Sequence, residues 1–280
     1  MSQGAGTRRL SWRVALYACV AMTVSIVIIP FLWEISTALK PENQLLARPP
    51  RLIPFPPTLE HFRHALERGV GRGLLNSLFV AGAASVLTVG IGSLAAYSLA
   101  RLRFRFSNLV LLLIIAPMML PGLSNLVPVY VIMSRIQILD THWVLILLYT
   151  VTHLPLGVWI LRGFFQSIPH EVEEAATLDG ATPVQSLCRI VMPMAQPALA
   201  ATALFVFTFS WNDFVIAVTM TSSASMRTAQ VWLWSTIGDV GTDWGALMAV
   251  SVLTNLPVLL VFVALERRFI TGLSAGAVRG

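Results

Sequence analysis

The chain has 280 residues, of which 56% are hydrophobic and 11% are charged. Soluble domains carry about a quarter charged residues, so this composition excludes an ordinary soluble protein and indicates one that crosses a membrane several times. The net charge of +6 does not indicate a nucleic-acid partner, because the basic residues stand at the ends of apolar segments rather than in one patch.

Six apolar segments are long enough to cross a bilayer. A helix of about 20 residues rises roughly 30 Å, which matches the hydrocarbon thickness. We therefore expect an all-α, multi-pass protein of the cell membrane, built as a single domain over residues 1–280, with six transmembrane helices at 14–33, 74–99, 109–130, 143–161, 197–220 and 246–265.

The first apolar segment favours a retained helix over a cleaved signal peptide, whose apolar region would be about 7–15 residues long. The polar stretch after it predicts an irregular external loop with one short amphipathic helix near Leu59–Leu66. His61 and His64 lie three apart on that helix, and we expect both to be solvated rather than bound to a metal.

The second apolar segment is rich in Gly, Ala and Ser, which predicts a central helix because small residues let helices approach closely. The third is interrupted by Pro117, Pro121 and Pro128. Such breaks are tolerated where the backbone is buried in protein or lines a wet cavity. A stretch of translocation pathway and a kinked packing helix are equally compatible with this pattern.

Polar residues inside the later segments are the other candidates for the pathway. Asp213 lies within an apolar segment, where a carboxylate is costly unless it is paired or wetted. It therefore marks either a cavity or a lock between helices. His153 is expected to bond a neighbouring helix. The pathway candidates are Asn125, Asn212, Asp213 and Asn255.

The distribution of basic residues predicts that both termini are cytoplasmic. Eleven of the 19 Lys and Arg residues fall in the predicted cytoplasmic segments and eight in the external ones. The external ones cluster in one long loop, where the positive-inside rule is weakest.

The polar interval of residues 166–195 predicts a helix, a turn and a second helix. Pro169 suits a first helical turn, and glutamates follow where the helix dipole favours carboxylates. Gly180 suits a left-handed end to the first helix. Thr182 can cap the second helix in a capping box with Gln185. Pro193 and Pro197 are expected to close that helix.

The same interval resembles the EAA signature of ABC importer permeases, with Met192 in place of the usual leucine. The matching residues are Glu174, Ala175, Ala176, Gly180, Ile190 and Pro193. Further segments resemble the maltose-permease (carbohydrate) branch of that family, namely PFLWEISTALKP, AAYSLAR, WND and ERRFITGLSAGAVRG.

The resemblance implies a type I importer permease fold in which residues 166–195 dock on a dimeric cytoplasmic ATPase. Glu174 would contact the ATPase, Ala175 and Ala176 would allow close approach, Asp179 would pack beside them and Gly180 would supply the turn. The tail Gly272–Gly280 would reach the ATPase interface.

The chain contains no Walker A sequence and no metal-ligand spacing, so we expect no catalytic, cofactor or metal site on it. ATP and Mg would be bound by the separate ATPase. The resemblance implies two further partners, a second and different permease chain and an extracytoplasmic solute-binding protein. The external loop Thr221–Gly245 would probe that binding protein, while lipid surrounds the spans.

The expected function is import of a sugar or sugar-like solute, powered by ATP. A permease for a polyol or a glycerol-phosphate solute is the nearest alternative. An ion-coupled secondary transporter would need several ionisable groups near the midplane, where the sequence offers Asp213 and His153. A membrane enzyme would need a catalytic constellation, and the sequence contains none.

Overall fold

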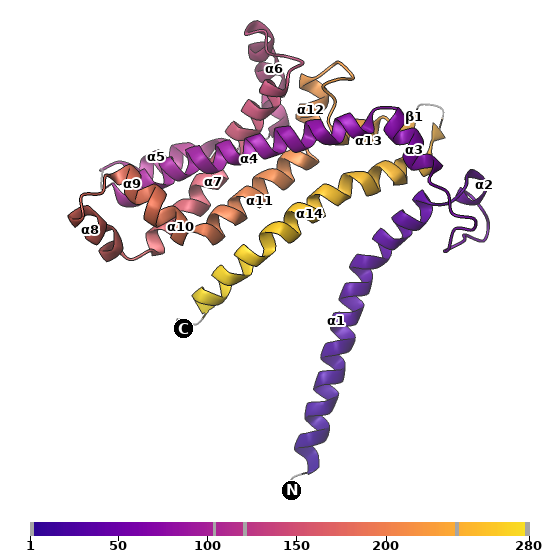
Figure 1. The fold of residues 1–280 in the computed structure, drawn as a ribbon, viewed down its shortest axis with the longest axis horizontal. Coiled ribbons are helices and arrows are strands. Elements are labelled where there is room, and N and C mark those ends of the chain that lie inside the picture. Colours follow the sequence, from indigo (N-terminus) through magenta and orange to yellow (C-terminus); the bar gives the residue numbers. More distant parts are fainter. Residues whose placement is uncertain (1–2, 103–104, 120–121, 239–240, 278–280) are drawn as a thin grey trace. The chain divides into compact units, whose positions relative to one another are not determined.

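The computed structural model describes the backbone of residues 3–102, 105–119, 122–238 and 241–277. Side chains are described from Trp12 to Ala264 within these ranges, except that of Leu123. The described elements are helices apart from one ladder of two short antiparallel strands (Figure 1). The all-α prediction is therefore confirmed.

The chain divides into two compact units. The first comprises Met1–Gly69 and Ser235–Leu253, and the second comprises Val70–Trp234 and Thr254–Gly280. The first unit holds α1 (Gln3–Ala38), α2 (Glu42–Leu45), α3 (Glu60–Glu67), β1 (Ile237–Gly238), β2 (Gly241–Thr242) and the start of α14 (Trp244–Ala277). The second holds the rest of α14 and all helices between α4 and α13.

The helices of the second unit follow one another with short connections. In chain order they are α4 (Val70–Arg101), α5 (Ser107–Ile115), η1 (Ala116–Met119), η2 (Gly122–Asn125), α6 (Leu126–Arg135), α7 (His142–Ser167), α8 (His170–Leu178), α9 (Pro183–Ser186), the π-helical turn η3 (Leu187–Val191), α10 (Met192–Met194), α11 (Gln196–Asn212), α12 (Val215–Met220) and α13 (Ala229–Trp234).

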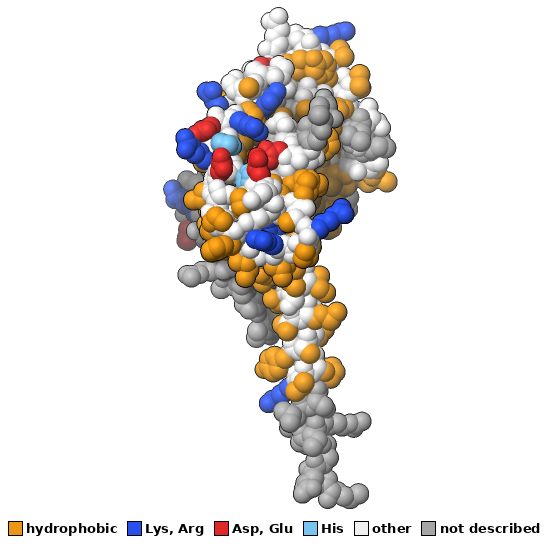
Figure 2. Space-filling model, turned by 90° about the vertical axis from the view of Figure 1, so that its right-hand side faces the viewer, with side chains coloured by type: hydrophobic (Ala, Val, Ile, Leu, Met, Phe, Trp, Pro, Cys, Tyr) orange, Lys and Arg blue, Asp and Glu red, His pale blue; other side chains and the backbone are white. Residues whose placement is uncertain are grey.

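Helix α1 carries hydrophobic side chains around its whole described surface. Those from Trp12 to Ile35 are exposed in the isolated chain, and Figure 2 shows them along the helix. A helix that is apolar on all sides suits a lipid environment or a core, not water. The exposure of α1 is therefore expected for a membrane-spanning helix.

A buried lysine follows α1. The Lys40 side chain is 2% exposed, and its ammonium lies 4.3 Å from the centre of the Trp33 ring. Burial lowers the pKa of Lys40. The Lys40 carbonyl accepts a hydrogen bond from His61 Nε2 at 2.9 Å. The prediction that both α3 histidines are solvated is therefore wrong for His61, which is buried because the chain folds back onto the end of α1, whereas His64 is exposed.

Helices α4, α7 and α11 pack side by side in the second unit (Figure 1). A Cβ atom added to Gly157 of α7 would lie 3.1 Å from a methyl of Thr88 in α4 and 3.3 Å from a methyl of Thr202 in α11. This glycine lets two neighbours approach the same turn of α7. The prediction that the second apolar segment forms a central helix is confirmed, because α4 packs against both α7 and α11.

The start of α4 also depends on a glycine. A Cβ atom on Gly73 would lie 2.3 Å from Cδ1 of the Trp232 indole. We predict that Gly73→Ala lowers the free energy of unfolding by about 1–3 kcal/mol, since the ring must move. Hydrogen exchange in α13 and the melting temperature in detergent measure this loss. Gly82→Ala, where nothing lies within 4 Å, is the matched control; equal losses in both variants would contradict the prediction.

The third apolar segment is broken, as its prolines predict. Helix α5 ends at Ile115, two short 3-10 turns follow, and α6 begins at Leu126. Pro117 lies in the first of these turns, and Pro128 lies in the opening turn of α6. Pro121 lies outside the described residues. The interruption is therefore confirmed, and the helices on either side of it are short.

Four described helices are long and apolar enough to cross a membrane by themselves. They include Trp12–Ala38, Val70–Arg101, His142–Ser167 and Trp244–Ala264. A fifth candidate is the pair Pro183–Met194 and Gln196–Asn212, which meet at 83°. The six-span topology is compatible with this set when the broken α5–α6 segment is the remaining span.

Candidate coupling hairpin and membrane polar residues

Residues 166–195 are called the coupling hairpin here. Its first helix, α8, begins one residue later than predicted. Pro169 is the N-cap of α8, with φ −57° and ψ 137°, rather than the first helical residue. Glu171 and Glu173 occupy the first turn, where carboxylates oppose the partial positive charge of the helix end.

The turn at Gly180 is a complete Schellman motif. Gly180 has φ +84°, and its N–H donates to the Thr177 carbonyl at 3.0 Å. The next N–H, of Ala181, donates to the Ala176 carbonyl at 2.9 Å. These two bonds satisfy carbonyls that a helix end otherwise leaves unpaired. The prediction of a left-handed glycine at the end of the first helix is confirmed.

The second helix begins as predicted. The Thr182 hydroxyl accepts from the Gln185 N–H at 3.3 Å, and the Gln185 side chain accepts from the Thr182 N–H at 2.9 Å. Pro183 is the first helical residue. The capping box, which local sequence alone predicted, is therefore confirmed.

The end of the hairpin agrees with the prediction. The second helix continues through the π-helical turn from Pro183 to Met194 and ends there, one residue after Pro193, while Pro197 lies in the first turn of α11. The change of direction occurs at the buried Ala195, between α10 and α11.

Four of the predicted coupling residues line one shallow groove between the two arms of the hairpin. The groove has a volume of about 280 Å³ and is lined by Ala176, Asp179, Gly180, Ala181, Gln185, Arg189 and Ile190. Glu174, Ala175 and Pro193 are exposed outside it. The small residues leave the backbone of the turn open to close approach.

The hairpin tip also exposes apolar side chains that the sequence analysis did not single out. Leu178 is 90% exposed and Val184 is 62% exposed. Two large apolar side chains on an otherwise polar hairpin favour a protein-binding surface over a solvated one.

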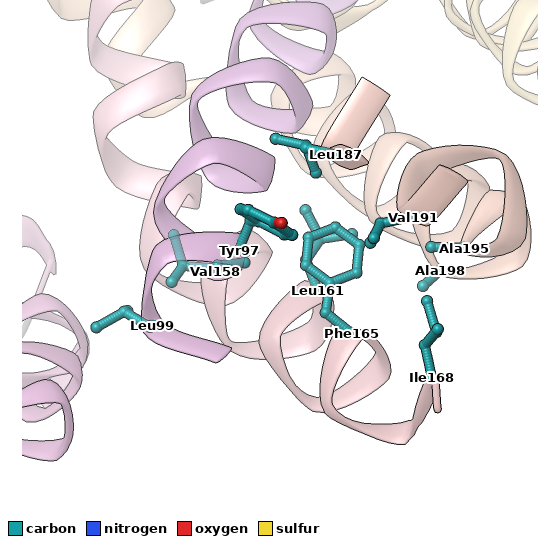
Figure 3. Packing of buried hydrophobic residues seen from close by; sticks show 11 residues of the cluster. Tyr97, Leu99, Val158, Leu161, Phe165, Ile168, Leu187, Val191, Ala195 and Ala198 are labelled. Atoms are coloured by element: carbon teal, nitrogen blue, oxygen red, sulfur yellow. The ribbon is translucent and has the colours of Figure 1, made fainter. Parts of the chain in front are cut away.

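The second arm of the hairpin is fixed by hydrophobic packing. Leu187 and Val191 of η3 are buried against Tyr97 of α4 and against Leu161 and Phe165 of α7 (Figure 3). Burial of each such aliphatic side chain contributes roughly 1.5–3 kcal/mol. The hairpin is thus attached directly to the ends of two membrane helices.

A polar contact from α4, which the sequence analysis did not predict, holds the first arm. Arg101 Nε lies 2.5 Å from Oε1 of Glu173, and the two side chains are 4% and 12% exposed. In the sequence, Arg101 is one of the eleven basic residues of the predicted cytoplasmic segments. Its pairing with a residue 72 positions away could not be recognised from local patterns.

Asp213 interrupts the fifth predicted span. Its backbone is extended, with φ −72° and ψ 126°. Its Oδ1 accepts hydrogen bonds from the N–H groups of Ile216 at 2.9 Å and Ala217 at 3.2 Å, and from Tyr149 Oη at 3.0 Å. The prediction of one continuous helix over 197–220 is therefore corrected, because the carboxylate caps a new helix, α12.

The other pathway candidates have different surroundings. Asn212 is exposed, donates to the Thr208 carbonyl at 2.9 Å and accepts from Gln230 at 3.2 Å. Asn125 is exposed at the end of η2, and Asn255 is half-buried in α14. Asn212 and Asp213 are adjacent in the chain and share the break between α11 and α12.

His153 of α7 lies among aromatic rings. Its ring centre is 6.5 Å from that of Tyr149 and 5.8 Å from that of Phe209. This places His153 on the same side of α7 as the tyrosine that bonds Asp213.

The segment before α13, which the sequence predicts to be external, is hydrogen-bonded to the start of α4. Asn76 is buried, and its amide donates to the carbonyls of Ser225 at 2.8 Å and Arg227 at 2.9 Å. Ser77 Oγ accepts from the Ala229 N–H at 2.9 Å. The part of the external loop that belongs to this unit is therefore held in a defined conformation.

Asp140 fixes the other end of that segment, since its Oδ1 accepts from the N–H groups of Ser222 and Ser223 at 2.9 and 3.0 Å. Burial raises the pKa of Asp140, but these hydrogen bonds outweigh it and the net shift is downward. A lowered pKa means that the stabilisation is present above the unfolded value of about 3.9 and is lost as pH falls through the folded value.

We therefore predict that the external pH does not release this segment between about pH 8 and pH 5. The protection factors of the Ser222 and Ser223 amides in hydrogen exchange should stay constant over that range. Asp140→Ala should lower them at every pH. Protection that fades by pH 5 in the unmutated chain would contradict this account.

The predicted ATPase-contacting tail, Gly272–Gly280, is described only in its backbone as far as Ala277, where helix α14 ends, and its side chains lie outside the described residues.

Comparisons with known proteins agree with this geometry. The family model described as "Binding-protein-dependent transport system inner membrane component" matches residues 88–273. The sulfoquinovosyl glycerol transport system permease protein SmoH of Agrobacterium fabrum is 34% identical over 90% of this chain and 88% of its own length. The trehalose transport system permease protein SugB of Mycobacterium tuberculosis is 32% identical over 98% of this chain and 100% of its own.

A solved structure shows the same fold. The crystal structure of a bacterial ABC transporter involved in the import of alginate contains a chain with a TM-score of 0.81 and 20% identity, covering 94% of this chain and 98% of that one. The family match covers most of the sequence and includes the hairpin. This chain therefore belongs to the binding-protein-dependent transport system inner membrane components, and it is a multi-pass permease subunit of an ABC importer in the cell membrane.

Proposed function

We propose that this permease carries a sugar or a sugar-like solute into the cell. The relatives SmoH and SugB, which are permeases of sulfoquinovosyl glycerol and trehalose transport systems, support this solute class. The glycerol part of the first keeps the polyol and glycerol-phosphate alternative open. Solute contacts are assigned to Asn125, Asn212, Asp213 and Asn255, because hydroxyl-rich solutes are held by a few well-placed polar groups.

The energy comes from a separate, dimeric ATPase that docks on the coupling hairpin. This assignment is supported by the open groove at Gly180, by the exposed Leu178 and Val184 beside it, and by the attachment of both arms to membrane helices. Glu174, Ala175, Ala176, Asp179, Gly180, Ile190 and Pro193 form the docking surface. ATP and Mg are bound by the ATPase, and this chain holds no cofactor.

Two further partners complete the importer. A second, different permease chain pairs with this one, and the whole chain acts as a single permease domain within that pair. An extracytoplasmic binding protein delivers the solute to the external segment that Asn76 and Asp140 fix. One solved importer with the same fold was crystallised in complex with a periplasmic protein that had alginate pentasaccharide bound, which supports such a partner.

Affinity capture tests this proposal. The tagged chain is extracted from its native membrane in mild detergent, and co-purifying proteins are identified by mass spectrometry. We expect a second permease and an ATPase with a Walker A sequence. The binding protein is then screened by thermal shift against sugars, glycerol glycosides and glycerol phosphates. A binding protein stabilised by glycerol phosphate alone would replace the sugar assignment by the alternative.

A further inference from the structure

Helix α8 has little hydrophobic attachment to the rest of the unit. All of α8 lies in the described part of the chain, and of its residues only Ala176 is buried. The other arm of the hairpin is different, because Leu187 and Val191 are fully buried in the core shared with α4 and α7. The first arm therefore depends on polar contacts.

One arginine makes several of these contacts. The Arg101 guanidinium pairs with Glu173 at 2.5 Å, donates from Nη2 to the Ile168 carbonyl at 2.7 Å, and lies 3.1 Å from the His170 ring through Nη1. These groups come from the residue before the N-cap and from the first and fourth positions of α8. A planar guanidinium can hold several acceptors in fixed directions, which a single lysine ammonium cannot do.

A tyrosine one turn earlier on α4 completes the arrangement. Tyr97 Oη donates to the second oxygen of Glu173, Oε2, at 2.8 Å. Helix α4 thus contacts both carboxylate oxygens of Glu173, with a hydrogen bond from Tyr97 to Oε2 and an ion pair from Arg101 to Oε1 that lacks hydrogen-bond geometry. The Tyr97 ring itself is packed in the buried cluster of Figure 3, so the hydroxyl that contacts Glu173 is held in place by the core of the unit.

Helix α4 extends from this contact to the opposite end of the bundle. Its 32 residues rise about 48 Å. Ala81, in its first half, is packed in a second buried cluster with Phe207 and Trp211 of α11. Trp211 directly precedes Asn212 and Asp213, at the break between α11 and α12. One continuous helix therefore joins the start of the coupling hairpin to the polar residues near the far end of α11.

We propose that Arg101, Glu173 and Tyr97 form a polar joint that transmits motion of α8 to α4 during ATP-driven transport. The three are positioning residues and need not touch the solute or the ATPase. The proposal rests on the function assigned above, since it requires an ATPase that moves the hairpin. Motion of one helix is transmitted to another through packed side chains and polar contacts that hold the two helices together.

The test separates docking from transmission with two single-cysteine reporters in the purified whole complex. Cys19 and Cys188 are first replaced by serine. The accessibility of Leu178→Cys then measures docking of the ATPase, and the accessibility of Asn212→Cys measures conformational change at the far end of α11. Reaction rates with a water-soluble maleimide are measured without nucleotide and after trapping with ATP and vanadate. We expect Leu178→Cys to be shielded in the complex, and Asn212→Cys to change its rate about fivefold or more on trapping.

Arg101→Gln and Glu173→Gln should leave Leu178→Cys shielded and ATP hydrolysis present, while the response at Asn212→Cys falls below about twofold. The charge-swapped pair Arg101→Glu with Glu173→Arg should restore part of the response. Glu171→Gln is the matched control, because Glu171 is an exposed carboxylate in the same turn. It should retain the full response.

Three results would overturn a part of the account. A normal response in both ion-pair variants would remove the joint and leave the proposed function standing. Loss of shielding at Leu178→Cys in those variants would make the pair a docking or folding element, not a transmitting one. No nucleotide response and no bound ATPase with the unmutated pair would contradict the proposed function itself.

Discussion

Gly180→Pro should release the ATPase from the importer and leave the second permease bound. Proline fixes φ near −65°, whereas Gly180 has φ +84°. Proline also removes the N–H that donates to the Thr177 carbonyl, so the Schellman turn cannot form. A change of this kind costs about 3 kcal/mol or more in a regular helix, and here it falls on the tip of the docking surface.

Affinity capture measures this effect. We expect the recovered ATPase to fall by about tenfold or more, which corresponds to roughly 1.4 kcal/mol of binding free energy. Gly180→Asn is the matched control, because asparagine tolerates the left-handed region and retains the N–H. Full ATPase recovery with Gly180→Pro would show that this turn is not part of the docking surface.

Asp213→Ala should destabilise the permease strongly. It removes the acceptor for two backbone N–H groups of α12 and leaves the Tyr149 hydroxyl, on a side chain only 1% exposed, without its partner. Loss of a helix cap costs about 1 kcal/mol, and a buried hydroxyl left without a partner costs about 1–3 kcal/mol more. The melting temperature of the detergent-purified protein should fall by several degrees.

Asp213→Asn separates the structural role of this residue from a role in the pathway. The amide oxygen can still accept from α12, so folding should be largely preserved. A loss of transport with a preserved melting temperature would then assign the Asp213 charge to the pathway. Normal transport and normal melting in Asp213→Ala would remove both roles.

The coupling hairpin was predictable because its signals are local. A glycine that needs φ > 0 and a capping box each act within about four residues, and the structure contains both as expected. The break in the third segment was predictable because three prolines lie close together there, whereas the single prolines Pro30, Pro155 and Pro257 lie inside continuous helices.

Tertiary contacts explain what the sequence did not predict. The Arg101–Glu173 pair joins residues from two helices. From the sequence alone, the same arginine is explained equally well as a basic residue at the cytoplasmic end of a span. His61 is buried because the chain returns to Lys40 and because Gly245 lies against its ring. The sequence shows that Asp213 is a polar residue in an apolar segment. The helix break at this residue depends on the hydrogen bonds that its carboxylate accepts, including one from Tyr149, and these bonds are not evident from the sequence.

Transport by the purified importer in sealed proteoliposomes is the most direct test of the central claim that this permease is driven by ATP through its hairpin. The radiolabelled solute is the sugar that stabilises the captured binding protein, and ATP is supplied on the side where the ATPase lies. The account predicts that uptake requires ATP and the binding protein. It also predicts that Gly180→Pro abolishes this uptake. Uptake by this chain alone, driven by an ion gradient without ATP, would contradict it and identify a secondary transporter.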